Sequence, residues 1–112
     1  MARIRALLRR AGGEGDPDAL QFEELRLDSA RHGVVVGETF VELTRTEYQL
    51  LELLMRNPRG VVTRDVALER VWGGEGEASH NVVDRYVAYL RRKLGDPPLI
   101  HTVRGIGFRL DT

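Results

Sequence analysis

The sequence predicts an α+β fold, with a small antiparallel sheet at the N-terminus, three helices in the middle and a β-hairpin at the C-terminus. Short apolar runs broken by glycine extend to Leu43, three segments of helical periodicity lie between Thr44 and Leu94, and alternating residues surround Gly105. The spacing of apolar residues separates strands from helices. Four very short strands do not fold alone, so we expect the helices to cover one face of their sheet.

Length and composition indicate one globular domain. A chain of 112 residues fits a single hydrophobic core, and 42% hydrophobic with 30% charged residues is the balance of a soluble protein. No apolar run approaches the roughly 20 residues that span a bilayer, so we expect a cytoplasmic protein with no membrane partner. The sequence has no cysteine, which excludes disulfides, thiolate zinc sites and thiol nucleophiles.

Charge is distributed unevenly, although the formal net charge is zero. Between Glu14 and Asp28, six acidic residues stand against Arg26 alone, a balance of −5. From Ser79 to the end of the chain, six basic residues stand against three acidic ones, a balance of +3. A basic C-terminal surface can therefore meet phosphate while the acidic N-terminal part faces away.

The first 18 residues predict a helical stub and a linker. Residues 1–10 have helical propensity, with Ile4, Leu7 and Leu8 at helical spacing. Residues 11–18 are rich in glycine and acid, as flexible linkers are. We therefore expect residues 19–112 to form the domain and residues 1–10 to be the end of a preceding domain. A basic N-terminus with no such domain is the alternative.

The first folded segment is expected to be a four-stranded antiparallel meander. Its apolar runs alternate with turn residues, among them Gly33 and Gly37. The four runs are Leu20 and Phe22, Leu25 and Leu27, Val34 to Val36, and Phe40 with Val41 and Leu43.

A first helix should begin after Thr44. Thr44 and Glu47 form a capping box, in which each side chain satisfies a backbone N–H that the helix leaves unpaired. The helix should end near Asn57, because Pro58 disfavours helical backbone at the residue before it. Its apolar stripe consists of Tyr48, Leu51, Leu54 and Met55.

Two further helices follow. The second begins at Thr63 as N-cap and ends at Gly73 and Gly74, which are favourable at a helix C-terminus. We expect it to bury Leu68, Val71 and Trp72. The third is capped by Ser79, reaches Leu94 and is closed by Gly95. We expect its buried face to consist of Val83, Val87, Leu90 and Leu94.

The last segment, from Leu99 to Leu110, predicts a hairpin around Gly105 and Gly107. Ile106, Phe108 and Leu110 alternate and should share its apolar face. Arg104 precedes Gly105 at the exposed tip, where a long cation has little to pack on and a minor-groove or phosphate contact is within reach.

The face of the third helix opposite its core residues carries long cations, an amide and a small residue. Arginine reads guanine edges in a major groove and asparagine reads adenine, so this face fits DNA. An ordinary solvated helix face is the alternative, and the basic tip of the following hairpin favours DNA over it. The residues of this face are Asn81, Arg85, Ala88 and Arg92.

Four blocks of the sequence resemble the effector domains of OmpR/PhoB-type response regulators, in the order of that family. They are Leu43-Thr-Arg-Thr-Glu-Tyr-Gln-Leu-Leu51, Val71-Trp-Gly73, Asn81-Val-Val-Asp-Arg-Tyr-Val-Ala-Tyr-Leu-Arg-Arg-Lys-Leu94 and Ile100-His-Thr-Val-Arg-Gly-Ile-Gly-Phe108. The resemblance covers the chain from about Phe22 to Leu110. The stub at residues 1–10 is similar to the end of the last helix of a receiver domain.

The resemblance implies a winged helix-turn-helix: an N-terminal four-stranded antiparallel sheet, a three-helix bundle and a C-terminal hairpin wing. It implies sequence-specific binding to double-stranded DNA, with the third helix in the major groove and the wing in the minor groove. Together with the exposed helix face, it predicts that DNA is contacted by Trp72, Asn81, Arg85, Tyr86, Ala88, Tyr89, Arg91, Arg92, Thr102 and Arg104.

Several of these positions depart from the family pattern. Positions 81, 88 and 89 are often basic in relatives but are Asn, Ala and Tyr here, and Arg85 replaces a commonly apolar residue. The departures concern the target sequence and not the mode of binding. Trp72 could instead close the second helix against the core, and Tyr86 could be a packing residue.

The resemblance also implies partners. A receiver domain, phosphorylated by a histidine kinase, would control the domain, which is expected to be a monomer alone and a tandem dimer on direct-repeat DNA. RNA polymerase is a further expected partner, and it would contact the loop formed by Gly73, Gly74, Glu75, Gly76, Glu77 and Ala78.

Two other functions are less well supported by the residues. An enzyme is not expected, because His32, His80 and His101 lie in separate segments and the sequence has neither a nucleophile elbow nor a phosphate loop. No cofactor or metal is expected. A winged helix that binds an acidic protein is the other alternative. On the DNA reading, Arg91→Ala and Arg104→Ala should weaken duplex binding with little change in melting temperature.

Overall fold

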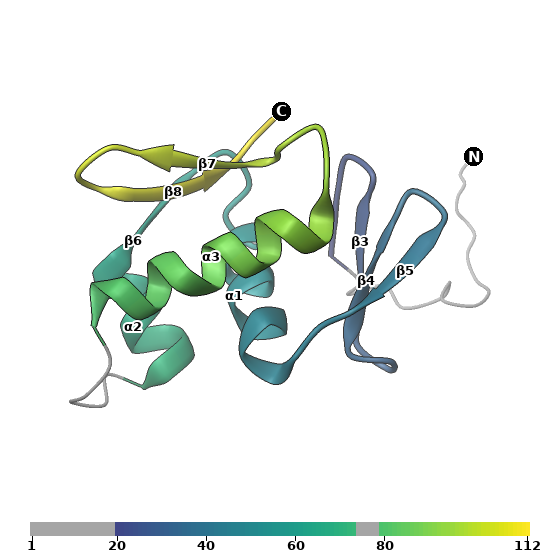
Figure 1. Cartoon of the computed structure of the whole chain (residues 1–112), viewed down its shortest axis with the longest axis horizontal. Coiled ribbons are helices and arrows are strands. Elements are labelled where there is room, and N and C mark those ends of the chain that lie inside the picture. Colours follow the sequence, from purple (N-terminus) through teal and green to yellow (C-terminus); the bar gives the residue numbers. More distant parts are fainter. Residues whose placement is uncertain (1–19, 74–78) are drawn as a thin grey trace.

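The computed structural model describes residues 20–73 and 79–112, which form two small sheets and three helices (Figure 1). The helices lie between the sheets, with the N-terminal sheet at one end of the molecule and the C-terminal sheet along the other (Figure 1). The predicted stub and linker lie outside the described residues, as do residues 74–78 of the expected polymerase-contact loop.

The N-terminal sheet is the predicted four-stranded meander. Its strands are β2 (Gln21–Phe22), β3 (Leu25–Asp28), β4 (Gly33–Val36) and β5 (Thr39–Glu42), and each pairs antiparallel with the next. Burial alternates along β3, where Leu25 and Leu27 are buried and Arg26 is exposed. This alternation places one face of the sheet on the core.

Helix α1 (Arg45–Met55) begins at the predicted capping box. The Glu47 backbone N–H donates to the Thr44 hydroxyl (3.2 Å), and the Thr44 N–H donates to the Glu47 carboxylate (2.9 Å). Lys93 of the third helix donates to the same carboxylate at 2.6 Å, although Glu47 is only 4% exposed. The capping box therefore also joins the start of α1 to the end of another helix.

Helix α2 (Arg64–Trp72) has the predicted ends. The Val66 N–H donates to the Thr63 hydroxyl (3.1 Å), and Gly73 terminates the helix in the left-handed conformation. Its burial differs from the prediction, since Ala67 is its fully buried residue. The larger side chains lie only partly buried against the edge of the core; they are Leu68, Val71 and Trp72.

Helix α3 (His80–Leu94) runs through the centre of the domain and packs on α1 and α2 (Figure 1). Its four buried residues are those predicted, and each is at most 8% exposed. Ser79 occupies the N-cap position, but the expected hydroxyl cap is absent. The Val82 N–H donates instead to the Ser79 backbone carbonyl (2.9 Å).

The C-terminal sheet has one strand more than predicted. Strands β7 (Ile100–Val103) and β8 (Gly107–Leu110) form the expected hairpin, hereafter the wing, and β6 (Val61–Thr63) pairs with β8 on its other side. The prediction for Ile106 is wrong: it lies in the turn and is 52% exposed, while Phe108 and Leu110 are buried. Across the described residues, no helix is both long and apolar enough to cross a membrane.

Candidate nucleic-acid interface

The predicted exposed face of α3 is exposed in the structure. Asn81, Arg85, Ala88 and Arg92 lie on one side of the helix, opposite its four core residues. Successive members are three or four residues apart, which aligns them along the helix axis. A straight helix face of this kind can present several side chains to a groove at once.

An aromatic cluster borders this face. The Trp72 ring meets the Tyr86 ring edge to face at a centroid distance of 5.5 Å, and Tyr86 meets Tyr89 in the same way at 5.2 Å. The Arg92 guanidinium lies 5.5 Å from the Tyr89 ring centroid. Trp72 and Tyr86 are half-buried against the core, so both side chains contribute to packing.

The one acidic residue among the described residues of α3, Asp84, is neutralised from another helix. Arg64 of α2 donates to its carboxylate at 2.8 Å, and the Arg64 side chain is only 18% exposed. The same guanidinium lies 4.7 Å from the centroid of the Phe108 ring in the wing. Pairing Asp84 lowers its repulsion of an approaching anion. Sequence reasoning missed Arg64, because its partner is 20 residues away and no local pattern connects them.

Arg91 joins α3 to the wing. Its Nε donates to the Ile100 carbonyl (3.0 Å), and its terminal nitrogen donates to the Thr102 hydroxyl (2.8 Å). The guanidinium is therefore committed within the domain. Thr102 accepts from Arg91 and keeps its own O–H, which can donate to a phosphate oxygen. Arg91 thus positions Thr102, a role that the sequence did not reveal.

These two hydrogen bonds change the expectation for Arg91. Arg91→Ala should lower the free energy of unfolding by about 1–2 kcal/mol, because it removes two charge-assisted hydrogen bonds across an interface. The melting temperature should fall by several degrees. Arg92→Ala, a neighbouring exposed arginine without such bonds in the described structure, is the control. An unchanged melting temperature for Arg91→Ala would contradict a positioning role.

Arg104 stands at the tip of the wing, followed by Gly105 with a φ of +74°. Only glycine adopts this left-handed backbone at no steric cost, so the tight turn explains Gly105. Within the described residues, Arg104 has no hydrogen bond or ion pair and is exposed. Its charge is thus available to a ligand.

The three histidines lie apart and contact different groups. His32 stacks on Tyr48, His80 lies 2.8 Å from Asp65, and His101 lies 3.1 Å from the Asp111 carbonyl. A search of residues 20–73 and 79–112 finds no group of three metal-ligating side chains.

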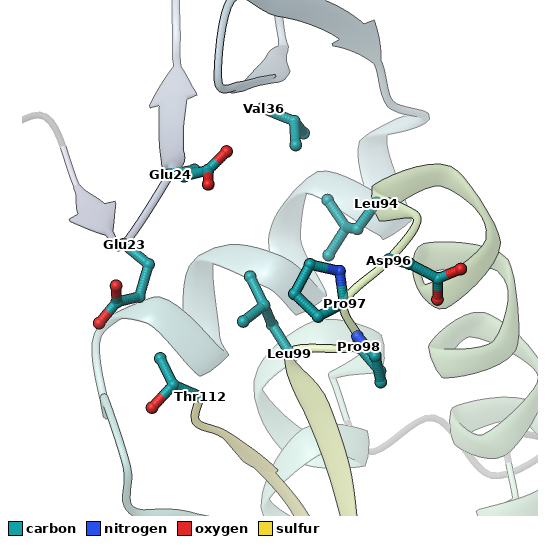
Figure 2. Close-up of a pocket in the computed structure, with 9 residues that line it drawn as sticks. All are labelled: Glu23, Glu24, Val36, Leu94, Asp96, Pro97, Pro98, Leu99 and Thr112. Carbon is teal, nitrogen blue, oxygen red and sulfur yellow. The ribbon is translucent and has the colours of Figure 1, made fainter.

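A cavity with an acidic rim lies at the C-terminal end of α3, between the N-terminal sheet and the segment after Leu94 (Figure 2). The Glu24 carboxylate of the β2–β3 turn points toward the apolar lining residues, whereas the carboxylates of Glu23 and Asp96 point away from them (Figure 2). Glu23 is paired with Arg59 at 3.5 Å, and the carboxylates of Glu24 and Asp96 leave negative charge at this rim, which disfavours phosphate here. The cavity is lined by Glu23, Glu24, Val36, Leu94, Asp96, Pro97, Pro98, Leu99 and Thr112.

Comparison with known proteins identifies the family. The family model described as "Transcriptional regulatory protein, C terminal" matches residues 37–110. The response regulator MprA of Mycolicibacterium vanbaalenii is 49% identical over 116 residues, which covers 98% of this chain and 50% of that protein. The chain thus spans about half the length of the curated relatives that it matches.

Solved structures of DNA-binding domains have a similar fold. The DNA-binding domain of CpxR from E. coli is 31% identical with a TM-score of 0.74, over 84% of this chain and 96% of that one. The Klebsiella pneumoniae RstA DNA-binding domain, solved with the RstA box, is 26% identical with a TM-score of 0.75, over 84% and 97%. The predicted winged-helix architecture is therefore confirmed.

The matched family consists of transcription regulatory domains and not of enzymes, in agreement with the sequence prediction. The chain therefore belongs to the C-terminal domain family of transcriptional regulatory proteins, as an effector domain of the OmpR/PhoB response-regulator type.

Proposed function

We propose that this domain binds double-stranded DNA sequence-specifically, with α3 in the major groove and the wing in the adjacent minor groove. The observation that carries the proposal is a pair of exposed cations in these two elements, Arg85 on α3 and Arg104 on the wing, neither of which has an ionic partner within the described residues. A helix fits the major groove, and an arginine at a hairpin tip suits the narrow, negative minor groove.

The surroundings of these cations support the same orientation. Arg64 neutralises Asp84 beside the exposed face, and Thr102 offers a hydroxyl on strand β7 of the wing. The cavity with the acidic rim lies at the C-terminal end of α3. Phosphate contacts position a protein on DNA. Because the cations and the acidic rim lie in different parts of the surface, the domain can approach a duplex in few orientations.

The same proposal includes the domain's regulation and its protein partners. Residues 1–10 are the end of a receiver domain and residues 11–18 a linker; a match that covers 98% of this chain but only 50% of MprA supports this assignment. Phosphorylation of that receiver by a histidine kinase would promote tandem binding to direct repeats in the cytoplasm, whereas the isolated domain is a monomer. The loop at residues 73–78 would contact RNA polymerase.

The salt dependence of binding tests the proposal. A domain that contacts about six phosphates should bind fluorescent genomic duplexes with a log–log slope in salt near −5. An absence of duplex binding at low salt would sink the proposal. Binding to an acidic protein instead of to DNA under the same conditions would favour the alternative function.

Removing the wing cation should weaken binding without unfolding the domain. Arg104→Ala should reduce duplex affinity several-fold and reduce the salt slope by about one, because one phosphate or minor-groove contact is lost. Its melting temperature should match the wild type, since Arg104 has no partner within the described structure. Arg26→Ala, an exposed arginine on the N-terminal sheet, is the matched control and should leave affinity unchanged.

A further inference from the structure

We infer that Arg85 selects the target sequence by donating two hydrogen bonds to a guanine in the major groove. The inference rests on the proposed DNA-binding function and deepens it, since it names the residue and the base. It starts from the state of each cation on the DNA-facing side, because a guanidinium already held by the protein cannot present its full set of donors to a base.

The other cations of α2 and α3 near this side are engaged. Arg91 donates to Ile100 and Thr102, Arg64 donates to Asp84, and Arg92 lies over the Tyr89 ring. Arg85 is exposed and forms no hydrogen bond, ion pair or ring contact within the described residues. Arg92 keeps its N–H donors but lies over a ring, so among the arginines of α3 Arg85 is the one with neither a hydrogen bond nor a ring contact within the described residues.

The neighbours of Arg85 leave it directed outwards. Asp84 is the adjacent acid, but its carboxylate is bound to Arg64 at 2.8 Å and residues i and i+1 point to different sides of a helix. Ala88, one turn further on, has no side chain long enough to block the approach of a base. Arg85 is thus exposed on the same helix face as Asn81 and Ala88, and no contact within the described residues holds its guanidinium.

The side chains of Arg85 and Asn81 predict which bases the exposed face of α3 prefers. The planar guanidinium fork matches O6 and N7 of guanine, and the Asn81 amide matches N6 and N7 of adenine. Four helical residues advance about 6 Å, or roughly two base-pair steps of 3.4 Å. The preferred half-site should thus contain a guanine with an adenine about two base pairs away.

Selection of bound duplexes from a random pool tests the inference, with the wild type, Arg85→Lys, Arg85→Ala and Arg26→Ala compared. The wild type should enrich guanine strongly at one position of each half-site. Arg85→Lys keeps the charge but lacks the planar fork, so the salt slope should stay near the wild-type value while the guanine preference falls several-fold. Arg85→Ala should lose the same preference, and Arg26→Ala, at an exposed arginine of the N-terminal sheet, should keep it.

The outcomes separate the inference from the proposed function. Retention of the guanine preference by Arg85→Lys and Arg85→Ala, with duplex binding intact, would overturn the role of Arg85 alone. Equal weakening of Arg85→Ala on all duplexes would also overturn it, because it would mark a phosphate contact. Failure of the wild type to bind any duplex would overturn the proposed function and the inference together.

Discussion

Gly107→Ala is expected to destabilise the domain by about 3 kcal/mol, because the added methyl group has no space. A Cβ at this position would lie 2.1 Å from the Val62 carbonyl oxygen and 2.8 Å from the Thr63 Cα, both backbone atoms of the paired strand β6. Backbone cannot give way as a side chain can. Strand β6 would separate from β8, and the buried contacts of Val62 and Phe108 would loosen.

Urea unfolding followed by circular dichroism measures this loss. Gly60→Ala is the matched control, because its Cβ would meet the nearest atom at an ordinary 3.4 Å. The control should change the free energy of unfolding by less than about 1 kcal/mol. Equal midpoints for the two variants would contradict the tight β6–β8 contact.

Lys93→Met is expected to cost about 2 kcal/mol at pH 7, because it leaves the Glu47 carboxylate buried without its ammonium partner. The distance between Lys93 Nζ and Glu47 Oε1 is 2.6 Å, and the Glu47 side chain is 5% exposed. The loss is smaller than for a fully buried pair, since the Lys93 side chain is 35% exposed. Methionine keeps the apolar stem and removes the ammonium group, together with its hydrogen bond to the Glu42 carbonyl (3.2 Å).

The pH dependence identifies the carboxylate. Burial disfavours the charged form, but hydrogen bonds from Lys93 and the Thr44 backbone outweigh it and hold the pKa of Glu47 below its ordinary value of 4.5. A lowered folded pKa contributes stability above the unfolded pKa, and this stability is lost as the pH falls through the folded pKa. The difference between wild type and Lys93→Met should therefore shrink below about pH 4.

Thermal unfolding between pH 3 and pH 7 measures this convergence. Arg92→Met, one residue earlier on the exposed side of α3, should change stability by less than about 0.5 kcal/mol at every pH. In a Glu47→Gln background, Lys93→Met should cost less than in the wild type, because the pair is coupled. A pH-independent cost of Lys93→Met would show that Glu47 is not the partner responsible.

The elements that local sequence patterns could predict depend on contacts between near neighbours. The capping box joins Thr44 to Glu47, and the buried face of α3 follows from spacings of three and four residues. Both require only helix geometry. The four-stranded meander is likewise made of consecutive strands, so alternation and turn residues suffice.

What the sequence could not show depends on distant residues. Strand β6 has three residues and is defined by its pairing with β8, more than forty residues later. The bond from Arg64 to Asp84 and the bonds from Arg91 to the wing cross between elements, so periodicity does not reveal them. Ile106 continues an alternating pattern, but the turn at Gly105 removes it from the strand.

The Phe108 ring has a consequence for DNA shape. Guanidinium groups from α2 and α3, those of Arg64 and Arg91, lie 4.7 and 5.8 Å from its centroid, so the wing is tied to both helices. The distance between α3 and the wing is thus fixed by contacts inside the protein. A duplex that engages both elements must already match this distance or bend to it. Stiff, narrow-grooved sequences should therefore bind with a different affinity from flexible ones, even where the contacted bases are identical.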